Sequence, residues 1–126
     1  MQYNKFYISN KDGKSNCVIR SFCKLFSEDY DKVYEELCCI AKELNCDSYN
    51  DIEVFETYMK RRDTLPFEYG EDMIVKNLNL DNGNYVVFCW DKNDFYHMVS
   101  IVDNVVYDKD DTSLDLYVIK IYKKLD

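Results

Sequence analysis

Glycine and proline are scarce in this chain, which has three glycines and one proline among 126 residues. No Gly/Ser-rich or Pro-rich stretch marks a linker, and the chain contains no internal repeat or low-complexity block. A chain of this length suits one modest hydrophobic core. We therefore expect a single domain that spans residues 1–126.

Long hydrophobic runs are also missing. The first residues, MQYNKFYISNKDGK, lack the apolar segment of a signal peptide, and no stretch is long enough to cross a bilayer. The sequence therefore predicts a cytoplasmic protein with no membrane partner.

Basic residues are too few to balance the acidic ones. Lysine and arginine total 16 against 24 aspartates and glutamates, which gives a formal net charge of -8. Binding of nucleic acid needs clustered lysine and arginine to neutralise phosphates, and the clusters at 60–62 and 123–124 are too small for that. We expect no direct nucleic-acid binding. The acidic surface suits solubility, a basic partner or a decoy that imitates nucleic acid.

Histidine occurs once, at His97, and this limits metal chemistry. There is no C-x-x-C pair, so the cysteines do not form a zinc set. Without a secretion signal they are expected to be reduced thiols, and we expect neither a metal nor another cofactor. The six cysteines are Cys17, Cys23, Cys38, Cys39, Cys46 and Cys89.

Hydrophobic residues make up 47% of the chain, and in its first half they recur at helical spacing. The pattern predicts a helix over residues 17–26, capped by Ser15 or Asn16. A second helix is expected to start at Ser27, and a third near Asn50, where NDIE has the form of a capping box. The region around Pro66 and Gly70 is expected to be a loop.

The second half of the chain has strand-like patterns instead. Four β-prone runs cover residues 85–90, 95–102, 105–108 and 116–122, and short turns separate several of them. The first run is continuously apolar and is expected to be buried on both faces; its Phe88 and Trp90 are expected in the core, with a cleft wall as the alternative. Helices followed by strands indicate an α+β fold, in which N-terminal helices pack on an antiparallel sheet of about four strands.

Cys17 stands apart from the other cysteines. On the predicted first helix it shares a polar face with Arg20 and Ser21, whereas Cys23 aligns with the apolar residues. It also lies in the first turn, where unpaired amides and the helix dipole stabilise an anion. The thiolate is the reactive form of cysteine, so this position favours a nucleophile over a core thiol.

His97 could act as the base for that nucleophile. A two-residue turn at 103–104 pairs Val102 with Val105, and this register places Asp108 one diagonal step from His97 on the same face. Asp110 would then lie opposite His97. A carboxylate at either position could fix the imidazole tautomer and stabilise the imidazolium, but a one-residue slip in register would move both to the other face. Arg20 is expected to pair with a carboxylate, with Asp108 favoured over one on a substrate.

Two segments, NCVIRSFCKLF (16–26) and YHMVSIVDNVVYD (96–108), resemble motifs of the papain-like cysteine peptidase superfamily, in particular its minimal members from bacteria and phages. The resemblance implies a papain-like fold with Cys17 as the nucleophile, His97 as the base and Asp108 as the orienting acid. No glutamine upstream of Cys17 matches the oxyanion residue of larger papain-like enzymes. Asn10 and Asn16 are the candidates, and Asn16 is favoured.

The resemblance implies a thiol hydrolase of the cysteine peptidase, isopeptidase or amidase type, acting on a protein or peptide substrate. The chain departs from the motif at several positions, so an alternative stays open. In that alternative the protein is an inactive papain-like binding or inhibitor protein of a phage or mobile element, and its target is a host protein in the bacterial cytoplasm. A structural or assembly protein with exposed interface tyrosines is a third possibility.

Overall fold

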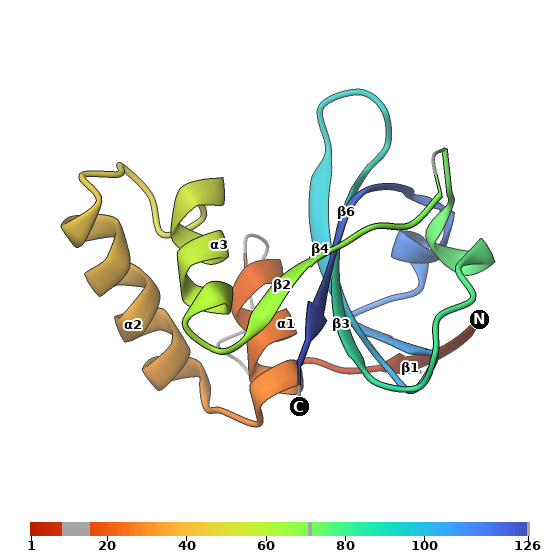
Figure 1. Cartoon of the computed structure of the whole chain (residues 1–126), viewed down its shortest axis with the longest axis horizontal. Helices are drawn as coiled ribbons and strands as arrows, with labels where there is room; N and C mark the ends of the chain where they lie inside the picture. The colour runs from red at the N-terminus through yellow and green to blue at the C-terminus, as the bar shows by residue number, and fades with distance from the viewer. Residues whose placement is uncertain (9–15, 71, 126) are drawn as a thin grey trace.

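The computed structural model describes residues 1–8, 16–70 and 72–125 of the chain, and it shows an α+β fold. Three helices lie on one side of a six-stranded mixed sheet (Figure 1). The elements in chain order are β1 (Gln2–Lys5), α1 (Cys17–Phe26), α2 (Tyr30–Glu43), α3 (Ile52–Lys60), β2 (Thr64–Phe67), η2 (Val75–Asn77), β3 (Asn84–Trp90), β4 (Tyr96–Val102), β5 (Val105–Asp108), η3 (Thr112–Asp115) and β6 (Tyr117–Lys124).

The sheet has two more strands than expected, and it is not wholly antiparallel. The strand order is β1-β5-β4-β3-β6-β2, and β1 runs parallel to β5 while the other neighbours are antiparallel. Both unexpected strands, β1 and β2, have four residues and lie at the edges. The loop predicted around Pro66 was wrong for β2, because an edge strand tolerates a proline that lacks the ladder N–H.

The helices follow the apolar spacing, but two of their starts differ from the prediction. Helix α1 has the expected bounds, but Asn16 at its N-cap makes no side-chain cap hydrogen bond, and Ser15 lies outside the described residues. Ser27 ends the helix with a left-handed φ of 52° instead of starting the next one. Helix α2 starts three residues later, where the Asp29 side chain accepts a hydrogen bond of 2.8 Å from the Lys32 amide. Helix α3 has Asp51 as its N-cap, one residue after the Asn50 that the NDIE capping box requires, and the Asp51 side chain makes no cap hydrogen bond. Of the helices in the described ranges, none combines the length and apolarity needed to cross a bilayer.

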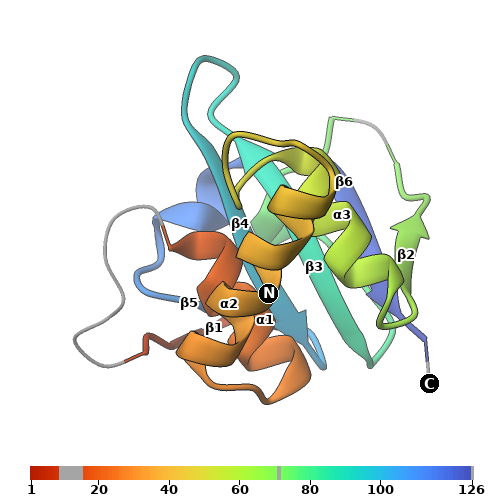
Figure 2. The ribbon, with the colours of Figure 1, turned by 90° about the vertical axis from the view of Figure 1, so that its left-hand side faces the viewer.

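Both faces of the sheet are buried, each by different segments. In Figure 2 the helices lie in front of the central strands, and residues such as Ile19, Phe22 and Leu37 form the core on this side. On the other side, the segment with Val75 and its neighbours covers the opposite face of the same strands. Strand β3 is therefore buried on both faces along most of its length, as its continuous apolar run predicts.

The turn between β4 and β5 sets the geometry of the site. Asp103 and Asn104 form a two-residue connection with φ of 49° and 63°, and Val102 pairs with Val105 as predicted. Asp and Asn tolerate this left-handed backbone because their short polar side chains bond locally. Continued by one residue, the register brings Asp108, at the end of β5, opposite Val99 and one diagonal step from His97.

We expect Asn104→Ala to lower the free energy of unfolding by about 2 kcal/mol. Alanine is strained at a positive φ, and the substitution also removes the hydrogen bonds that the Asn104 side chain makes with the backbone N–H and C=O of Leu80. Chemical denaturation would measure the loss. Asn104→Gly is the matched control, because it keeps the backbone unstrained and removes only the side-chain bonds. Equal stability of the alanine variant and the wild type would contradict this role of the turn.

Candidate active site

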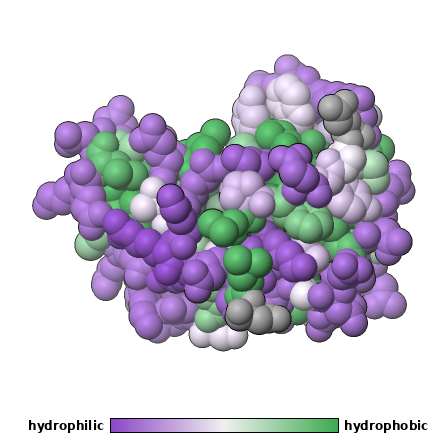
Figure 3. Space-filling model, in the orientation of Figure 1, coloured by the Kyte–Doolittle hydropathy of each residue, from purple (hydrophilic) through white to green (hydrophobic). Residues whose placement is uncertain are grey.

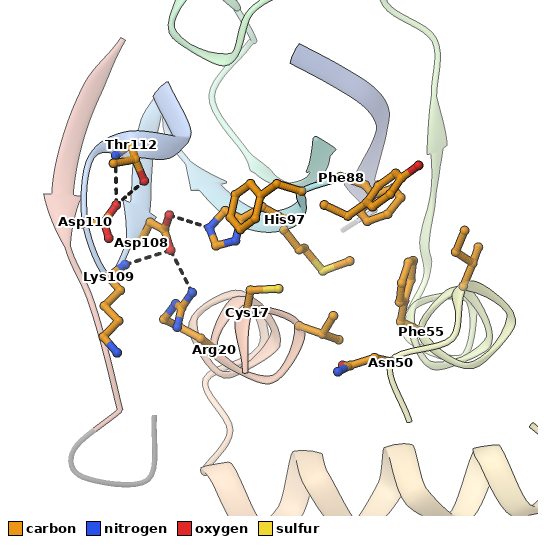
Figure 4. Close-up of a pocket in the computed structure, with 15 residues that line it drawn as sticks. Cys17, Arg20, Asn50, Phe55, Phe88, His97, Asp108, Lys109, Asp110 and Thr112 are labelled. Atoms are coloured by element: carbon orange, nitrogen blue, oxygen red, sulfur yellow. Dashed lines mark hydrogen bonds and ion pairs between the residues drawn. The ribbon is translucent and has the colours of Figure 1, made fainter. Parts of the chain in front are cut away.

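A cleft of about 740 Å³ opens where α1 begins, between the helices and one end of the sheet (Figure 4). Four segments form its walls: the first turn of α1, the start of α3, the β3–β4 hairpin and the turn after β5. The residues that line it are Cys17, Val18, Arg20, Asn50, Ile52, Phe55, Phe88, Phe95, Tyr96, His97, Met98, Asp108, Lys109, Asp110 and Thr112. The three residues singled out from the sequence, Cys17, His97 and Asp108, are thus brought together in one cleft.

Cys17 is the first residue of α1, and its side chain faces the cleft (Figure 4). The apolar residues that follow it, among them Ile19 and Phe22, are buried in the helix-side core. Cys23, six residues further on, is buried in the helix-side core, as its apolar face predicts. The two cysteines of this helix therefore occupy different environments.

His97 lies near the start of β4 and bonds to Asp108 at the end of β5. Its Nε2–H donates to Asp108 Oδ2 over 2.8 Å, as the predicted hairpin register requires. Because Nε2 is engaged by the carboxylate, Nδ1 is the ring nitrogen left for Cys17. The ring of Phe95 stacks on the imidazole with a centroid distance of 5.6 Å and covers it from the solvent.

Arg20 holds the other oxygen of the same carboxylate. Its Nη2 lies 3.1 Å from Asp108 Oδ1, and the two side chains are only 5% and 2% exposed. The Lys109 backbone N–H also donates to Oδ1 over 2.8 Å. Asp108 was thus correctly favoured as the partner of Arg20, and the carboxylate is fixed from both sides with one oxygen directed to His97.

The backbone of Asp108 is fixed as well, by a strand that the sequence pattern did not predict. Its carbonyl accepts hydrogen bonds from the Phe6 amide (2.8 Å) and from the Tyr3 hydroxyl (3.1 Å). Tyr3 belongs to β1, which pairs in parallel with β5. The edge strand therefore positions the carboxylate that orients His97.

The electrostatics of the cleft favour a charged Cys17–His97 pair. Burial raises the pKa of the Cys17 thiol, but a hydrogen bond to His97, the charge of His97, the Met98 backbone and the charge of Arg20 together hold it below the usual value. Burial lowers the pKa of His97, yet hydrogen bonds to Asp108 and Cys17 and their negative charges raise it to about 9. Between the lowered pKa of Cys17 and about pH 9, the pair is thiolate and imidazolium.

Asp108 stays ionised throughout this range. Burial raises its pKa, but the hydrogen bond to His97, the charge of His97, the Lys109 amide and the charge of Arg20 outweigh burial and lower it. An ionised carboxylate only accepts hydrogen bonds, so it keeps the proton on Nε2 of His97. The anions of Cys17 and Asp108 are thus matched by the cations of His97 and Arg20.

The asparagines near Cys17 differ in how they lie relative to the cleft. Asn16 is not among the residues that line the cleft, and its Oδ1 accepts a hydrogen bond of 3.2 Å from the Tyr49 hydroxyl. Its oxyanion role stays a prediction, and Asn10 lies outside the described residues. Asn50 does line the cleft beside the start of α1 (Figure 4), and sequence reasoning missed it because it stands 33 positions from Cys17.

Asp110 and Phe88 lie only partly where the sequence predicts them. Asp110 does not pair opposite His97, because β5 ends at Asp108 and the Asp110 carboxylate accepts from the amide and hydroxyl of Thr112. Phe88 is half-buried and forms a cleft wall while it also packs against the helix-side core. Phe88 therefore belongs both to the core and to the cleft wall, which the sequence presented as alternatives.

The remaining cysteines show no sign of acting at the site. All six are free, and burial raises the pKa of Cys89 well above its usual range. Within residues 1–8, 16–70 and 72–125, no group of three or more His, Cys, Asp or Glu side chains is arranged to hold a metal ion.

Comparisons with known proteins found no relative of this chain. No protein-family model matches the chain, and searches of curated proteins and of solved structures found no match.

Proposed function

We propose that the protein is a papain-like thiol hydrolase that cleaves a peptide, isopeptide or other amide bond through Cys17, His97 and Asp108. The observation that carries the proposal is the continuous chain of contacts from Arg20 through Asp108 to His97, which ends at a thiol of lowered pKa in an open cleft. The order of a helix-borne cysteine, a strand-borne histidine and a carboxylate on the next strand supports the papain-like assignment.

The geometry supports a two-step reaction. In the first step the Cys17 thiolate attacks the substrate carbonyl, and amides at the start of α1 stabilise the oxyanion, because the first-turn N–H groups have no partners within the helix. His97 gives its proton to the leaving amine as the carbon–nitrogen bond breaks. Asp108 holds the imidazolium in the orientation needed for this transfer.

In the second step a water molecule replaces the leaving amine. His97, now neutral, takes a proton from the water, and the resulting hydroxide equivalent attacks the thioester of the acyl-enzyme. The carbon–sulfur bond breaks, the acid product leaves, and the proton on His97 restores the ion pair with Cys17. If another nucleophile took the place of the water, the same groups would catalyse acyl transfer to it.

An activated ester tests the proposal without knowledge of the natural substrate. We expect p-nitrophenyl acetate to acetylate Cys17 in a rapid burst, followed by slower turnover as His97 activates water. Cys17→Ala should abolish the burst, and His97→Ala should slow the release of acetate by about 10² or more. Stopped-flow absorbance and peptide mass spectrometry would measure the two steps.

The five other cysteines serve as controls in the same sample. Acetylation spread evenly over the thiols, or a burst that survives in the Cys17→Ala variant, would contradict the proposal. That result would favour the alternative of an inactive papain-like protein that binds a host protein.

A further inference from the structure

Helix α1 carries one more charged side chain on the polar face that includes Cys17. Lys24 follows Cys17 by seven residues and Arg20 by four, so the three side chains lie on one stripe along the helix. Most of the surface that Figure 3 shows is hydrophilic, as expected where charged side chains extend into water. Lys24 is half-buried instead, and the proposed two-step reaction does not use it.

The ammonium group of Lys24 lies over two aromatic rings. Its Nζ is 3.9 Å from the centroid of the Tyr107 ring and 5.7 Å from that of Phe6, and both distances are short enough for a cation–π contact. The two rings meet edge to face, with centroids 6.5 Å apart and planes at 89°. We call Lys24, Tyr107 and Phe6 the lysine clamp. It joins α1 to β5 and to the residue that follows β1.

The lysine clamp holds the same part of β5 as Arg20 does. Tyr107 directly precedes Asp108, whose Oδ1 lies 3.1 Å from Arg20 Nη2. The Phe6 amide donates to the Asp108 carbonyl over 2.8 Å, so the residue that completes the clamp also holds the backbone of the orienting acid. Two adjacent residues of one strand thus bind two cations that stand about one helical turn apart on α1.

Two attachment points constrain the helix more than one does. If only Arg20 tied the polar face of α1 to β5, the helix could turn about that contact and carry Cys17 away from His97. Lys24 holds the helix one turn further from Cys17, so the same movement would separate its ammonium from the Tyr107 ring. Cys17 needs this alignment, because the hydrogen bond and charge of His97 help to hold the pKa of its thiol below the usual value.

We propose that Lys24 is a positioning residue for Cys17: the lysine clamp fixes α1 against β5 and thereby keeps the thiol in contact with His97. This inference rests on the proposed function, because it gives Lys24 a part in the reactivity of Cys17. Lys24 acts through the helix, since it is not among the residues that line the cleft.

Alkylation of Cys17 by iodoacetamide in the full chain tests the inference, because this small reagent needs only an accessible thiolate. We expect Lys24→Met to slow the reaction at mildly acidic pH by about fivefold, because losing the contact shifts the balance between aligned and misaligned helix by no more than the strength of that contact. Lys24→Arg should react within about twofold of the wild type, because a guanidinium also binds aromatic faces. Peptide mass spectrometry would give the rate at each cysteine.

Two readouts separate alignment from a general loss of stability. Lys24→Met should move the pH dependence of Cys17 alkylation to higher pH, and proton NMR should show a lower midpoint for His97, because the contact between the two groups lowers the pKa of the thiol and raises that of the imidazole. Tyr107→Leu, which removes the other half of the clamp, should slow alkylation by a similar factor. The double variant Lys24→Met/Tyr107→Leu should be no slower than either single variant, since both break the same contact.

Lys123→Met is the matched control. The Lys123 ammonium also lies over two rings, 5.7 Å from the centroids of both Phe67 and Tyr85, and none of these three residues lines the cleft. We expect this variant to react at the wild-type rate.

The outcomes distinguish the inference from the proposed function. If wild-type Cys17 reacts much faster than the exposed Cys39, but Lys24→Met reacts equally fast or Lys123→Met is slowed as much, the inference is overturned and the proposed function stands. Tyr107→Leu gives the same test if Lys24→Met does not fold. If wild-type Cys17 reacts no faster than an ordinary thiol, the proposed function falls and this inference falls with it.

Discussion

Replacing His97 with alanine is expected to slow alkylation of Cys17 by on the order of 10² at mildly acidic pH. In the wild type, the hydrogen bond and charge of His97 keep the pKa of Cys17 lowered against the effect of burial. Without the imidazole only burial and weaker contributions remain, and an ordinary thiol of pKa about 8.5 is roughly 0.3% thiolate at pH 6. Iodoacetamide labelling of each cysteine, followed by peptide mass spectrometry across pH, would measure the effect.

The other thiols supply internal references for that experiment. Cys39 is exposed and reports the reagent itself, whereas Cys89 is buried and has a raised pKa, so it should label slowly in both proteins. Equal labelling rates for Cys17 in the wild type and in His97→Ala would show that the histidine does not activate the thiol.

Replacing Arg20 with methionine is expected to lower the free energy of unfolding by about 3 kcal/mol. Methionine fills much of the space but leaves the Asp108 carboxylate, 2% exposed, with the His97 imidazolium alone, whose charge it shares with the Cys17 thiolate. A buried charge that loses its partner keeps its desolvation cost, which is larger than the attraction an exposed pair provides. Chemical denaturation at neutral pH would measure the loss.

Two further variants separate the buried charge from packing. Arg61→Met breaks the Arg61–Glu43 ion pair, in which both side chains are at least half exposed, and should cost less than about 1 kcal/mol. The double variant Arg20→Met/Asp108→Asn removes the uncompensated charge and should regain part of the lost stability. A single Arg20→Met variant as stable as Arg61→Met would show that the buried pair has no such role.

The parts of the site that could be predicted from the sequence depend on local geometry. The position of Cys17 follows from where an apolar helical stripe begins, and the distance between His97 and Asp108 follows from a two-residue turn with fixed register. Each needs only residues close together in the chain, so periodicity and turn chemistry were sufficient. The α+β class follows in the same way from the change of period along the sequence.

The parts that could not be predicted depend on contacts between distant segments. Strand β1 has the polar sequence QYNK and pairs with β5 only because the sheet offers a free edge there. Asn50 reaches the cleft through the packing of α3 against the sheet, which no local pattern records. The sequence left open whether Phe88 lies in the core or in a cleft wall, because an apolar side chain has the same signature in either place.

The central claim is that His97 is held as an imidazolium between Asp108 and the Cys17 thiolate. Burial alone would lower the pKa of His97, whereas its hydrogen bonds to Asp108 and Cys17 and their charges raise it from 6.5 to about 9, so the two influences predict opposite directions. A raised pKa also means that folding favours the protonated ring. Its contribution to stability is complete below about pH 6.5 and is lost as the pH rises through about 9.

Proton NMR of the imidazole tests this claim most directly, because His97 is the only histidine and gives a single titration curve. We expect a midpoint near pH 9 in the wild type, and a lower midpoint, still above 6.5, in Cys17→Ser, where the contact with Asp108 remains. A wild-type midpoint at or below 6.5 would mean a neutral imidazole at physiological pH, and it would contradict the ion pair on which the proposed hydrolase depends.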